Sequence, residues 1–584
     1  MRVYDRSSAL PALARERVHL RSGASLVFWA ATALPPLGIL AFILKLGVNL
    51  PFQDDWDMLA VVTRWHAGTL TFADFWRQHS EHRIAVLKGM IWAAGIATDF
   101  NVVANMHIGF ALSSVKLVLL FDLIRRHVKG RASGMSAPLA LVSSLLMFSL
   151  VQYEDWFWGT AALQFSLLNL CTVTVVWVLS RWPDSWRALA TAVVCAILGV
   201  FTEVSGHVLW VTGALAIWLF TERRERAVHR LLAWLAAAAC VLLIYLWDLR
   251  WAPSSSATAF FDYPSRLVAF TGACLGLPFA FWMTPGWAAV VGYGSLIPFV
   301  VSGLWLHVKD RARLRSMYPF LLFALHGAVV CVLIALGRSK GDPQGALTSH
   351  YSFAPNLYWI AVLTVTVVTC AEAWPVFTFR GRLVGLTLAA TVALVLATFY
   401  VKGNAEGYHR AYTRSRNLQM ALATLSFSTT PPPPVLRFLY EPDERRALAL
   451  VEELRAANLG PFSGAVAAEP AHVEQFDPVP AGEQPEGVLD GGDCYGATGW
   501  AWNPADPDRP VTVKIWSGDS LLGTATANWF RWDLLAAVKG NGQHAFHFSF
   551  PAQSRLGTGR VVTVTYGDTN TLLWQSPKTI HCRD

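Results

Sequence analysis

The residues best suited to chemistry lie in two short stretches in the first fifth of the chain. Asp54, Asp55 and Asp57 follow the first long apolar segment, where a membrane helix is expected to emerge into water. Residues 78–83 bring histidine, carboxylate and guanidinium groups into the same predicted loop. Ionisable groups are costly beside a bilayer and usually serve a function there. The two stretches together predict an active site at a membrane surface.

The acidic stretch provides two candidates for a general base. A carboxylate can remove a proton from an attacking hydroxyl group. Asp54 is our first choice for the base and Asp55 the second, and both stay candidates because the sequence alone does not separate them. Acidic residues also suit the first turn of a helix, which is the structural alternative for both.

The second stretch offers groups that could bind substrate. His79 and His82 are three residues apart, which would place them on one face of a helix. With Glu81 and a loop aspartate they could bind Mg²⁺ or Mn²⁺, but we favour contact with substrate and assign no cofactor as certain. Arg83 could pair with a phosphate or with Glu81.

Later turns, predicted on the same side, add further polar groups. Glu154 and Asp155 lie among aromatic residues in one turn, and the alternative for them is an interfacial belt. A later loop supplies cations and hydrogen-bonding groups that could bind phosphate or substrate, namely Arg338, Lys340, His350 and Tyr351.

Composition places these loops on a membrane protein. The chain has 584 residues, of which 54% are hydrophobic and 15% charged, whereas soluble domains carry about 25% charged residues. About eleven apolar runs are long enough to cross a bilayer. They lie near residues 25–47, 101–124, 135–152, 163–181, 187–202, 204–221, 229–249, 286–307, 317–337, 356–375 and 381–401. A further apolar stretch near 264–283 carries Pro278 and suits a re-entrant or interfacial helix.

The distribution of basic residues predicts the orientation of these helices. Clusters of Arg and Lys at 125–131, 181–187, 223–230, 309–315 and 380–382 fall on one side if the N-terminus is cytoplasmic. The acidic loop and the C-terminal region then face the other side of the membrane, outside the cytoplasm. The net charge of +8 is mainly this topology signal, and it does not indicate nucleic-acid binding.

The change of sequence pattern after residue 402 predicts that the chain is divided into three regions. We expect a transmembrane domain over 1–402, a helical and Pro-rich connection over 403–488, and a periplasmic β-sandwich over 489–584. In the last region the hydrophobic period becomes two, and residues 511–525 read as a hairpin. Four tryptophans there could stack on sugars, although burial in the core is favoured: Trp500, Trp502, Trp529 and Trp532. Cys494 and Cys582 bracket the domain and could form a disulfide outside the cytoplasm.

Three motifs on a chain with this pattern resemble the GT-C class of membrane glycosyltransferases. They are Gln53-Asp54-Asp55-Trp56, His79-Ser80-Glu81-His82-Arg83 and Glu154-Asp155-Trp156-Phe157-Trp158-Gly159. The resemblance covers roughly residues 20–400 and is closest to a bacterial branch of the class. The C-terminal segment, with Gly499-Trp500-Ala501-Trp502-Asn503-Pro504, is similar to a β-module appended to bacterial surface-polysaccharide proteins.

The resemblance implies a GT-C-like helical fold and a hexosyl- or pentosyltransferase. The donor would be a polyprenyl-phosphate sugar, and the acceptor a glycan, a lipid or a protein at the periplasmic face. In the class an aspartate of the first outer loop is the base or a metal ligand, which corresponds to Asp54 or Asp55 here. This chain departs from the branch pattern at Ser80 and Asp155, where asparagine is expected, and at His350, where arginine is expected. Arg338 and Lys340 are the substitutes for that arginine.

Three alternatives compete with this interpretation. An O-antigen ligase or polymerase would rely on arginine and histidine in large outer loops, and the acidic first loop argues against it. A transporter of lipid-linked glycans would need ionisable residues inside its spans and often an internal repeat. A scaffold that carries a sugar-binding domain would not need the carboxylates of the first loop.

Overall fold

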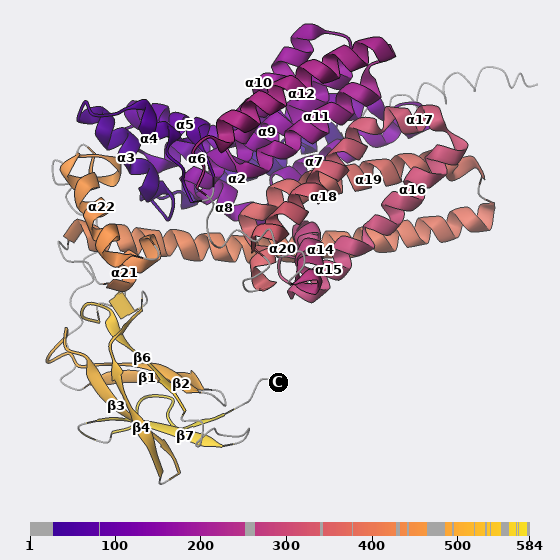
Figure 1. The fold of residues 1–584 in the computed structure, drawn as a ribbon. Coiled ribbons are helices and arrows are strands. Elements are labelled where there is room, and N and C mark those ends of the chain that lie inside the picture. Colours follow the sequence, from indigo (N-terminus) through magenta and orange to yellow (C-terminus); the bar gives the residue numbers. More distant parts are fainter. Residues whose placement is uncertain are drawn as a thin grey trace, which may run out of the picture. The chain divides into compact units, whose positions relative to one another are not determined.

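A computed structural model gives the fold of the chain (Figure 1). It describes residues 27–80, 82–250, 263–338, 343–376, 378–427, 433–440, 443–463, 485–492, 496–518, 520–531, 534–535, 537, 539–550, 560–567, 569 and 571–580. Four predicted residues, Glu81, Lys340, Cys494 and Cys582, lie outside this set, as does Trp532. The chain forms two compact units. One comprises Met1–Ser415 with Leu459–Pro461, and the other Arg416–Asn458 with Phe462–Asp584.

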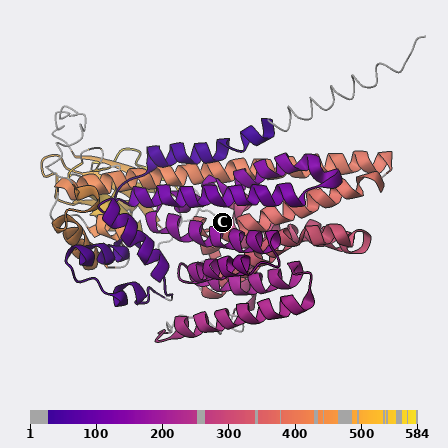
Figure 2. The same ribbon diagram turned by 90° about the horizontal axis from the view of Figure 1, so that it is seen from above.

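The first unit is helical. Its longer helices are α2 (Leu34–Leu46), α6 (Val102–His127), α7 (Ser136–Met147), α9 (Gly159–Arg181), α10 (Trp186–Val200), α11 (Val208–Phe220), α12 (Arg224–Leu246), α14 (Pro264–Ala280), α15 (Pro285–Gly294), α16 (Leu296–Lys309), α18 (Tyr318–Arg338) and α19 (Phe353–Ala373). Shorter elements complete it: α3 (Asp55–His66), α4 (Phe72–Trp76), α5 (Ala85–Ala97), η1 (Gly130–Met135), η2 (Leu150–Gln152), α8 (Tyr153–Phe157), η3 (Val204–His207), α17 (Arg311–Ser316), η4 (Pro343–Leu347), η5 (Ser349–Ser352) and η6 (Trp374–Val376). Seen from above, the long helices run along a common direction (Figure 2).

The predicted membrane-spanning architecture is confirmed. Among the described residues, nine helical segments are long and apolar enough to cross a bilayer. They are Val27–Leu46, Val102–His127, Gly130–Phe157, Gly159–Arg181, Arg224–Leu246, Pro285–Lys309, Tyr318–Arg338, Ser349–Val376 and Phe379–Leu422. The predicted spans at 187–202 and 204–221 form the shorter apolar helices α10 and α11. The stretch near 264–283 forms α14, whose second half is buried despite its internal Pro278.

Helices α6 and α9 pack closely in the centre of this unit. A Cβ atom at Gly109 of α6 would lie 2.4 Å from the carbonyl oxygen of Ala162 in α9. Real Cβ contacts are not that short, so glycine is required for the two backbones to approach. Ser113 and Ser166 share a buried hydrogen bond of 3.0 Å across the same interface. The close approach places the first turns of both helices side by side.

The connection between α2 and α6 folds into three short helices. Thr71 begins α4 with a capping box, because Asp74 accepts hydrogen bonds from the backbone and hydroxyl of Thr71. Arg64 of α3 binds the same carboxylate, and these partners lower the pKa of Asp74 against the opposing effect of its desolvation. The first loop is therefore a structured cap.

Helix α20 (Phe379–Phe427) leaves the first unit. Its 49 residues correspond to about 74 Å, more than twice the thickness of the hydrocarbon core. Its polar second half was expected to belong to a connection that begins at residue 403, but the first compact unit extends to Ser415. Asn404 accepts a hydrogen bond of 2.7 Å from the backbone of Leu150, which ties this part of the helix to η2.

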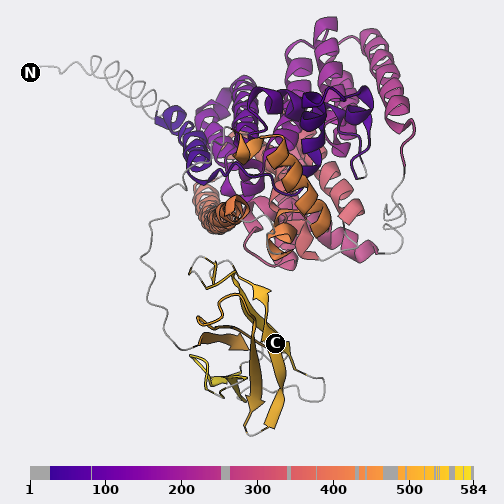
Figure 3. The same cartoon turned by 90° about the vertical axis from the view of Figure 1, so that its left-hand side faces the viewer.

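The second unit contains two short helices and a β-sandwich (Figure 3). The helices are α21 (Pro433–Leu439) and α22 (Glu444–Ala456), and the turn η7 (Gly460–Phe462) follows them in sequence. The strands are β1 (Glu486–Gly492), β2 (Gly496–Trp502), β3 (Val511–Ser517), β4 (Ser520–Ala527), β5 (Trp529–Phe530), β6 (Gln543–Ser549), β7 (Val561–Tyr566) and β8 (Lys578–Thr579). One sheet has the order β1-β2-β6-β5 and the other β4-β3-β7-β8.

The predicted period of two is confirmed in these strands. β3 and β4 form the antiparallel hairpin expected over 511–525, with Val513 opposite Ala525. Side chains from both sheets, including Val513, Phe546 and Val564, fill the core between them. The domain therefore has an interior of its own.

Gly109→Ala should destabilise the protein by about 1–3 kcal/mol, because the added methyl group would force α6 away from α9. The melting temperature of the detergent-solubilised protein measures this effect. Gly38→Ala is the matched control, since a Cβ atom at Gly38 of α2 meets nothing within 4 Å. That change should be neutral or slightly stabilising. Equal melting temperatures for the two variants would contradict the close packing of α6 and α9.

Candidate functional site

The two adjacent aspartates of the first loop have different environments. The side chain of Asp54 is 48% exposed, whereas Asp55 is 2% exposed. Gln53 has a left-handed backbone with φ of 48°, and α3 begins at Asp55. This turn directs one carboxylate to the surface and the other into the protein.

Asp55 connects the first loop to the start of α9. Its Oδ1 atom accepts hydrogen bonds from the backbone N–H of Thr160, at 2.7 Å, and from the Thr160 hydroxyl, at 2.5 Å. Its Oδ2 atom accepts one from the backbone of Phe52, at 3.1 Å. A carboxylate at a helix N-terminus is stabilised by the unpaired N–H groups there. Asp55 therefore has an anchoring role.

Asp54, Asp57 and His79 form what we call the acidic cluster. One ligand atom from each residue lies within 4.8 Å of the others. The His79 ring lies between the carboxylates, with Nε2 3.8 Å from Asp54 and Nδ1 4.0 Å from Asp57. Asp54 and Asp57 are three residues apart at the start of α3, so they lie on the same side of it.

The donor atoms of the acidic cluster suit a divalent cation. Two carboxylates and one imidazole are ligands that Mn²⁺ accepts, and the carboxylates also suit Mg²⁺. The distances of 3.8 and 4.0 Å are too long for direct hydrogen bonds, so the gap between the three groups is wide enough for an ion. The sequence had suggested His79, Glu81 and His82 as ligands together with a loop aspartate. Among the described residues, the structure groups His79 with Asp54 and Asp57, and Glu81 lies outside those residues.

The expected helical arrangement of His79 and His82 is wrong. Their backbones exchange two hydrogen bonds of 2.9 Å in an antiparallel bridge, and Ser80 between them has φ of 48°. His79 and His82 are therefore paired across a turn of the chain. A spacing of three residues is compatible with either a helix or such a turn. The neighbouring Gln78 donates hydrogen bonds to the carbonyls of Ser80 and Arg250, which accompany the turn.

Arg83 lies inside the protein and is 3% exposed. Its guanidinium group donates hydrogen bonds to the carbonyls of Tyr245, at 2.9 Å, Trp76, at 3.0 Å, and Trp247. It also stacks over the Trp76 ring. These contacts engage three of the five N–H groups of the guanidinium within the protein, which favours a structural role, and the phosphate-binding role stays a prediction.

Glu154, His350 and Arg414 form a second cluster, which we call the Glu154 network. One carboxylate oxygen of Glu154 lies 2.8 Å from Nδ1 of His350, and the other lies 2.6 Å from the Arg414 guanidinium. The His350 ring stacks on Phe165 with 5.3 Å between ring centroids. The structure therefore joins two residues predicted from separate loops, Glu154 and His350.

The remaining predicted residues surround this network. Tyr351 packs against the His350 ring and forms a hydrogen bond with Arg338, which is exposed at the end of α18. Asp155 is 4% exposed and its Oδ1 atom has no hydrogen-bond partner. Its charge interacts with that of buried Lys116 in α6. Lys340 is outside the described residues.

Arg414 is the site residue that the sequence interpretation missed. It lies in the polar half of α20, which had been read as part of a connecting region. Arg410 and Arg414, one turn apart on a helix that follows a membrane span, were the available signal. An arginine was expected near position 350, and Arg414 supplies a guanidinium group beside His350 from a different part of the chain.

The acidic cluster and the Glu154 network are linked through aromatic residues. Arg414 lies over the ring of Phe52, whose backbone donates to Asp55. Trp158 contacts both Phe52 and His350, with ring centroids 5.9 and 5.8 Å apart. The arrangement places an exposed carboxylate and an arginine-containing network in one region at the end of the membrane helices.

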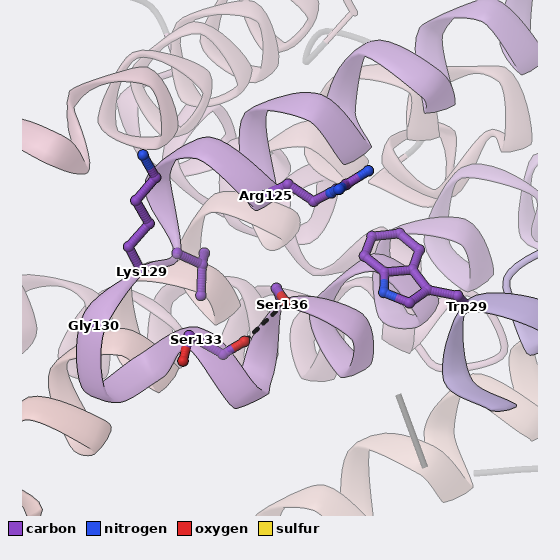
Figure 4. A pocket seen from close by; sticks show the side chains of 7 residues that line it. Trp29, Arg125, Lys129, Gly130, Ser133 and Ser136 are labelled. Carbon is purple, nitrogen blue, oxygen red and sulfur yellow. Dashed lines mark hydrogen bonds between the residues drawn. The ribbon is translucent and has the colours of Figure 1, made fainter. Parts of the chain in front are cut away.

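A cavity of about 420 Å³ lies at the opposite end of α6 from this region. It is lined by Trp29, Arg125, Val128, Lys129, Gly130, Ser133 and Ser136. Figure 4 shows the Arg125 side chain directed toward the Trp29 ring, whereas Lys129 points away from it. Because the 26 residues of α6 extend about 39 Å, the cavity and the acidic cluster are separated by more than the hydrocarbon core.

Comparisons with known proteins give little further information. No protein-family model matches the chain, and no curated protein matches it. Among solved structures, the chain is similar to a crystal structure of the Archaeoglobus fulgidus oligosaccharyltransferase tethered to an acceptor peptide that contains the NVT sequon. The TM-score is 0.39 and the identity 12%, and the match covers 72% of this chain and 59% of that chain. A likeness at this level carries no argument about the fold, the reaction or the substrates.

Asp55→Asn should change how stability depends on pH. Burial raises the pKa of Asp55 from 3.8 to about 6, against the effect of its hydrogen bonds. The folded protein then binds this proton more tightly than the unfolded chain does, so the stabilising contribution is present below about pH 4 and is lost as the pH rises to about 6. Melting curves should show wild type losing about 3 kcal/mol relative to the variant across that interval.

Asp54→Asn is the matched control for this experiment, because Asp54 is exposed and adjacent. Because Asp55 is retained in this variant, its stability should still fall as the pH rises from about 4 to 6. A profile of Asp55→Asn that is parallel to wild type would show that Asp55 does not titrate in this interval.

Arg414→Met should destabilise the protein by about 3 kcal/mol or more, because it leaves the buried carboxylate of Glu154 without its guanidinium partner. Thermal unfolding of the solubilised protein measures the loss. In the control Arg410→Met, the side chain of Arg410 is 38% exposed and pairs with Glu406 one turn away, so a cost of about 1 kcal/mol or less is expected. Similar losses for both variants would mean that the Glu154 network contributes no more than a surface ion pair.

Proposed function

We propose that this protein is a GT-C-type glycosyltransferase. It transfers a sugar from a polyprenyl-phosphate-linked donor to a hydroxyl group of a glycan, a lipid or a protein. The observation that carries the proposal is the exposed carboxylate of Asp54, which is held beside Asp57 and His79 at the end of the membrane helices. Buried Asp55 fixes that position by binding the start of α9.

In the proposed reaction Asp54 is the general base. It accepts the proton of the acceptor hydroxyl while the oxygen attacks the anomeric carbon of the donor sugar. The bond from that carbon to the phosphate oxygen breaks, and the polyprenyl phosphate leaves with the bonding electrons. Arg338 is exposed beside the Glu154 network and neutralises the charge that develops on the phosphate.

A divalent cation fits the acidic cluster in this proposal. Asp54, Asp57 and His79 would hold Mn²⁺ or Mg²⁺, because their donor atoms converge without direct hydrogen bonds between them. The ion, when bound, would supply positive charge beside the donor phosphate. Asp54 would bind the ion through one carboxylate oxygen, which leaves its other oxygen to act as the base.

The proposed location is the inner membrane of a bacterium, with the acidic cluster on the periplasmic side. The last turn of α6 contains Arg125, Arg126 and His127, and the first turn lies beside the site. Basic residues favour the cytoplasmic side of a membrane. The far side lacks nucleotide sugars, so a lipid-linked donor is consistent with this orientation.

One observation favours a second candidate function, the transport of lipid-linked glycans. Lys116 is 3% exposed in the middle of α6, inside the membrane-spanning region, and its charge interacts with that of Asp155. Buried ionisable pairs of this kind occur in transporters. The acidic cluster has no evident use in transport, so we favour the transferase.

Asp54→Asn should lower the turnover of polyprenyl-phosphate sugars by about 100-fold or more, because removal of a general base costs two to four orders of magnitude. Purified protein is assayed against a panel of synthetic donors and hydroxyl acceptors, with and without EDTA. The melting temperature of this variant should equal that of wild type, because the side chain is 48% exposed. Sensitivity to EDTA that Mn²⁺ reverses would support the metal site.

Asp55→Asn is the companion variant. It should lose activity together with thermal stability, because it disturbs the contact to Thr160. Full turnover by Asp54→Asn would contradict the proposed base. Consumption of no donor by the wild-type protein, with glycolipid movement across proteoliposomes, would favour the transporter.

A further inference from the structure

Three tryptophans form a row across the first sheet of the C-terminal domain. Trp500 of β2 lies opposite Ala545 of β6, and Ala545 lies opposite Trp529 of β5. On its other side Trp500 lies opposite Val488 of β1. Val488 in turn forms a parallel β-bridge with Trp574. Directly opposite residues of a sheet point to the same face. We call Trp500, Trp529 and Trp574 the tryptophan row.

The tryptophan row lies on the outer face of the sheet. The neighbouring cross-strand row, which contains Leu489, Gly499 and Phe546, faces the core. Successive residues of a strand point to opposite faces, so the tryptophans face away from the core. Trp529 is 62% exposed and Trp574 is 69% exposed. Trp500, between them in the row, is half-buried.

Two ion pairs lie near the row, and Lys578 donates hydrogen bonds to the carbonyls of Leu489 and Asp490 and to the side chain of Gln575. Glu486 lies 2.5 Å from Lys539, and Asp490 pairs with Arg531. The exposed polar neighbours on the same face are Thr498 and His547, which lie opposite each other. The surface is therefore aromatic in the middle, polar at its edge and close to neutral. A single-stranded nucleic acid would need unpaired cations beside the rings.

We propose that the tryptophan row binds a neutral oligosaccharide chain. A pyranose ring has an apolar face of C–H groups that packs against an indole ring, and its hydroxyl groups can bond the polar edge of the surface. Strands are spaced by about 4.8 Å, so the row of five positions extends about 19 Å. This length accommodates a chain of several sugars with ring contacts at alternate strands.

The proposed glycan binding is independent of the proposed transfer reaction. It requires neither Asp54 nor a lipid donor, and it can be measured without turnover. Failure of the transferase assay would leave this proposal unaffected, and failure of glycan binding would leave the proposed base unaffected.

The test measures glycan binding to the full-length protein in detergent by isothermal titration calorimetry. The probes are linear neutral hexasaccharides of glucose and of mannose, with the matching disaccharides. Hexasaccharides should bind more tightly than disaccharides, and affinity should change little with salt, because the ligand is uncharged. Trp529→Ala and Trp574→Ala should each weaken binding by about twofold to tenfold, the range expected when one aromatic contact is lost.

Two variants control for nonspecific effects. Leu521→Ala removes a 48% exposed apolar side chain of β4, in the other sheet, and should leave affinity unchanged. Trp529→Phe keeps an aromatic face and should retain most of the affinity. Absence of binding by all hexasaccharides, equal binding by the alanine variants, or a shift from dimer to monomer in light scattering when Trp574 is replaced would each overturn the proposal.

Discussion

The hydrogen bonds from Thr160 and Phe52 to Asp55 determine the organisation of the proposed site. They join the first loop to the beginning of α9, which is itself packed against α6 by the close contact at Gly109. A buried carboxylate is unfavourable on its own, and three donors offset part of that cost. The surface position of Asp54 follows from this anchor, because the residues are adjacent and the chain turns between them.

Much of the fold could be predicted from composition and periodicity. Long apolar runs correspond to the membrane helices, since a bilayer imposes a length that is visible in sequence. The β-domain was visible from its period of two. The lengths of α10 and α11 were harder to predict. An apolar helix of 15 or 13 residues packed inside the bundle has the same composition as a membrane-spanning helix. Their length in the structure depends on the turns that end them.

The site was only partly predictable. Asp54, His79, Glu154 and His350 were identified by residue type and by their side of the membrane, both of which are local properties. The different roles of Asp54 and Asp55 depend on the left-handed backbone at Gln53 and on contacts with α9, which the local pattern does not contain. Arg414 reaches Glu154 across 260 positions of sequence, so no local pattern could connect them. For Arg83 the local pattern suggested a phosphate-binding cation, whereas in the structure its guanidinium group binds backbone carbonyls.

The spacing of the aspartates at the start of α3 limits where homologous chains could gain or lose residues. Asp54 and Asp57 share one side of the helix, while Asp55, Trp56 and Leu59 are buried on others. Each residue of a helix advances about 100° around its axis. Deletion of one residue between 54 and 57 would leave the two carboxylates two positions apart, about 200° around the axis, and would break up the acidic cluster. Gly68, with no contact near its Cβ position, lies in a loop that has no such restriction. Length variation in this cap is compatible with the site only after α3 has ended.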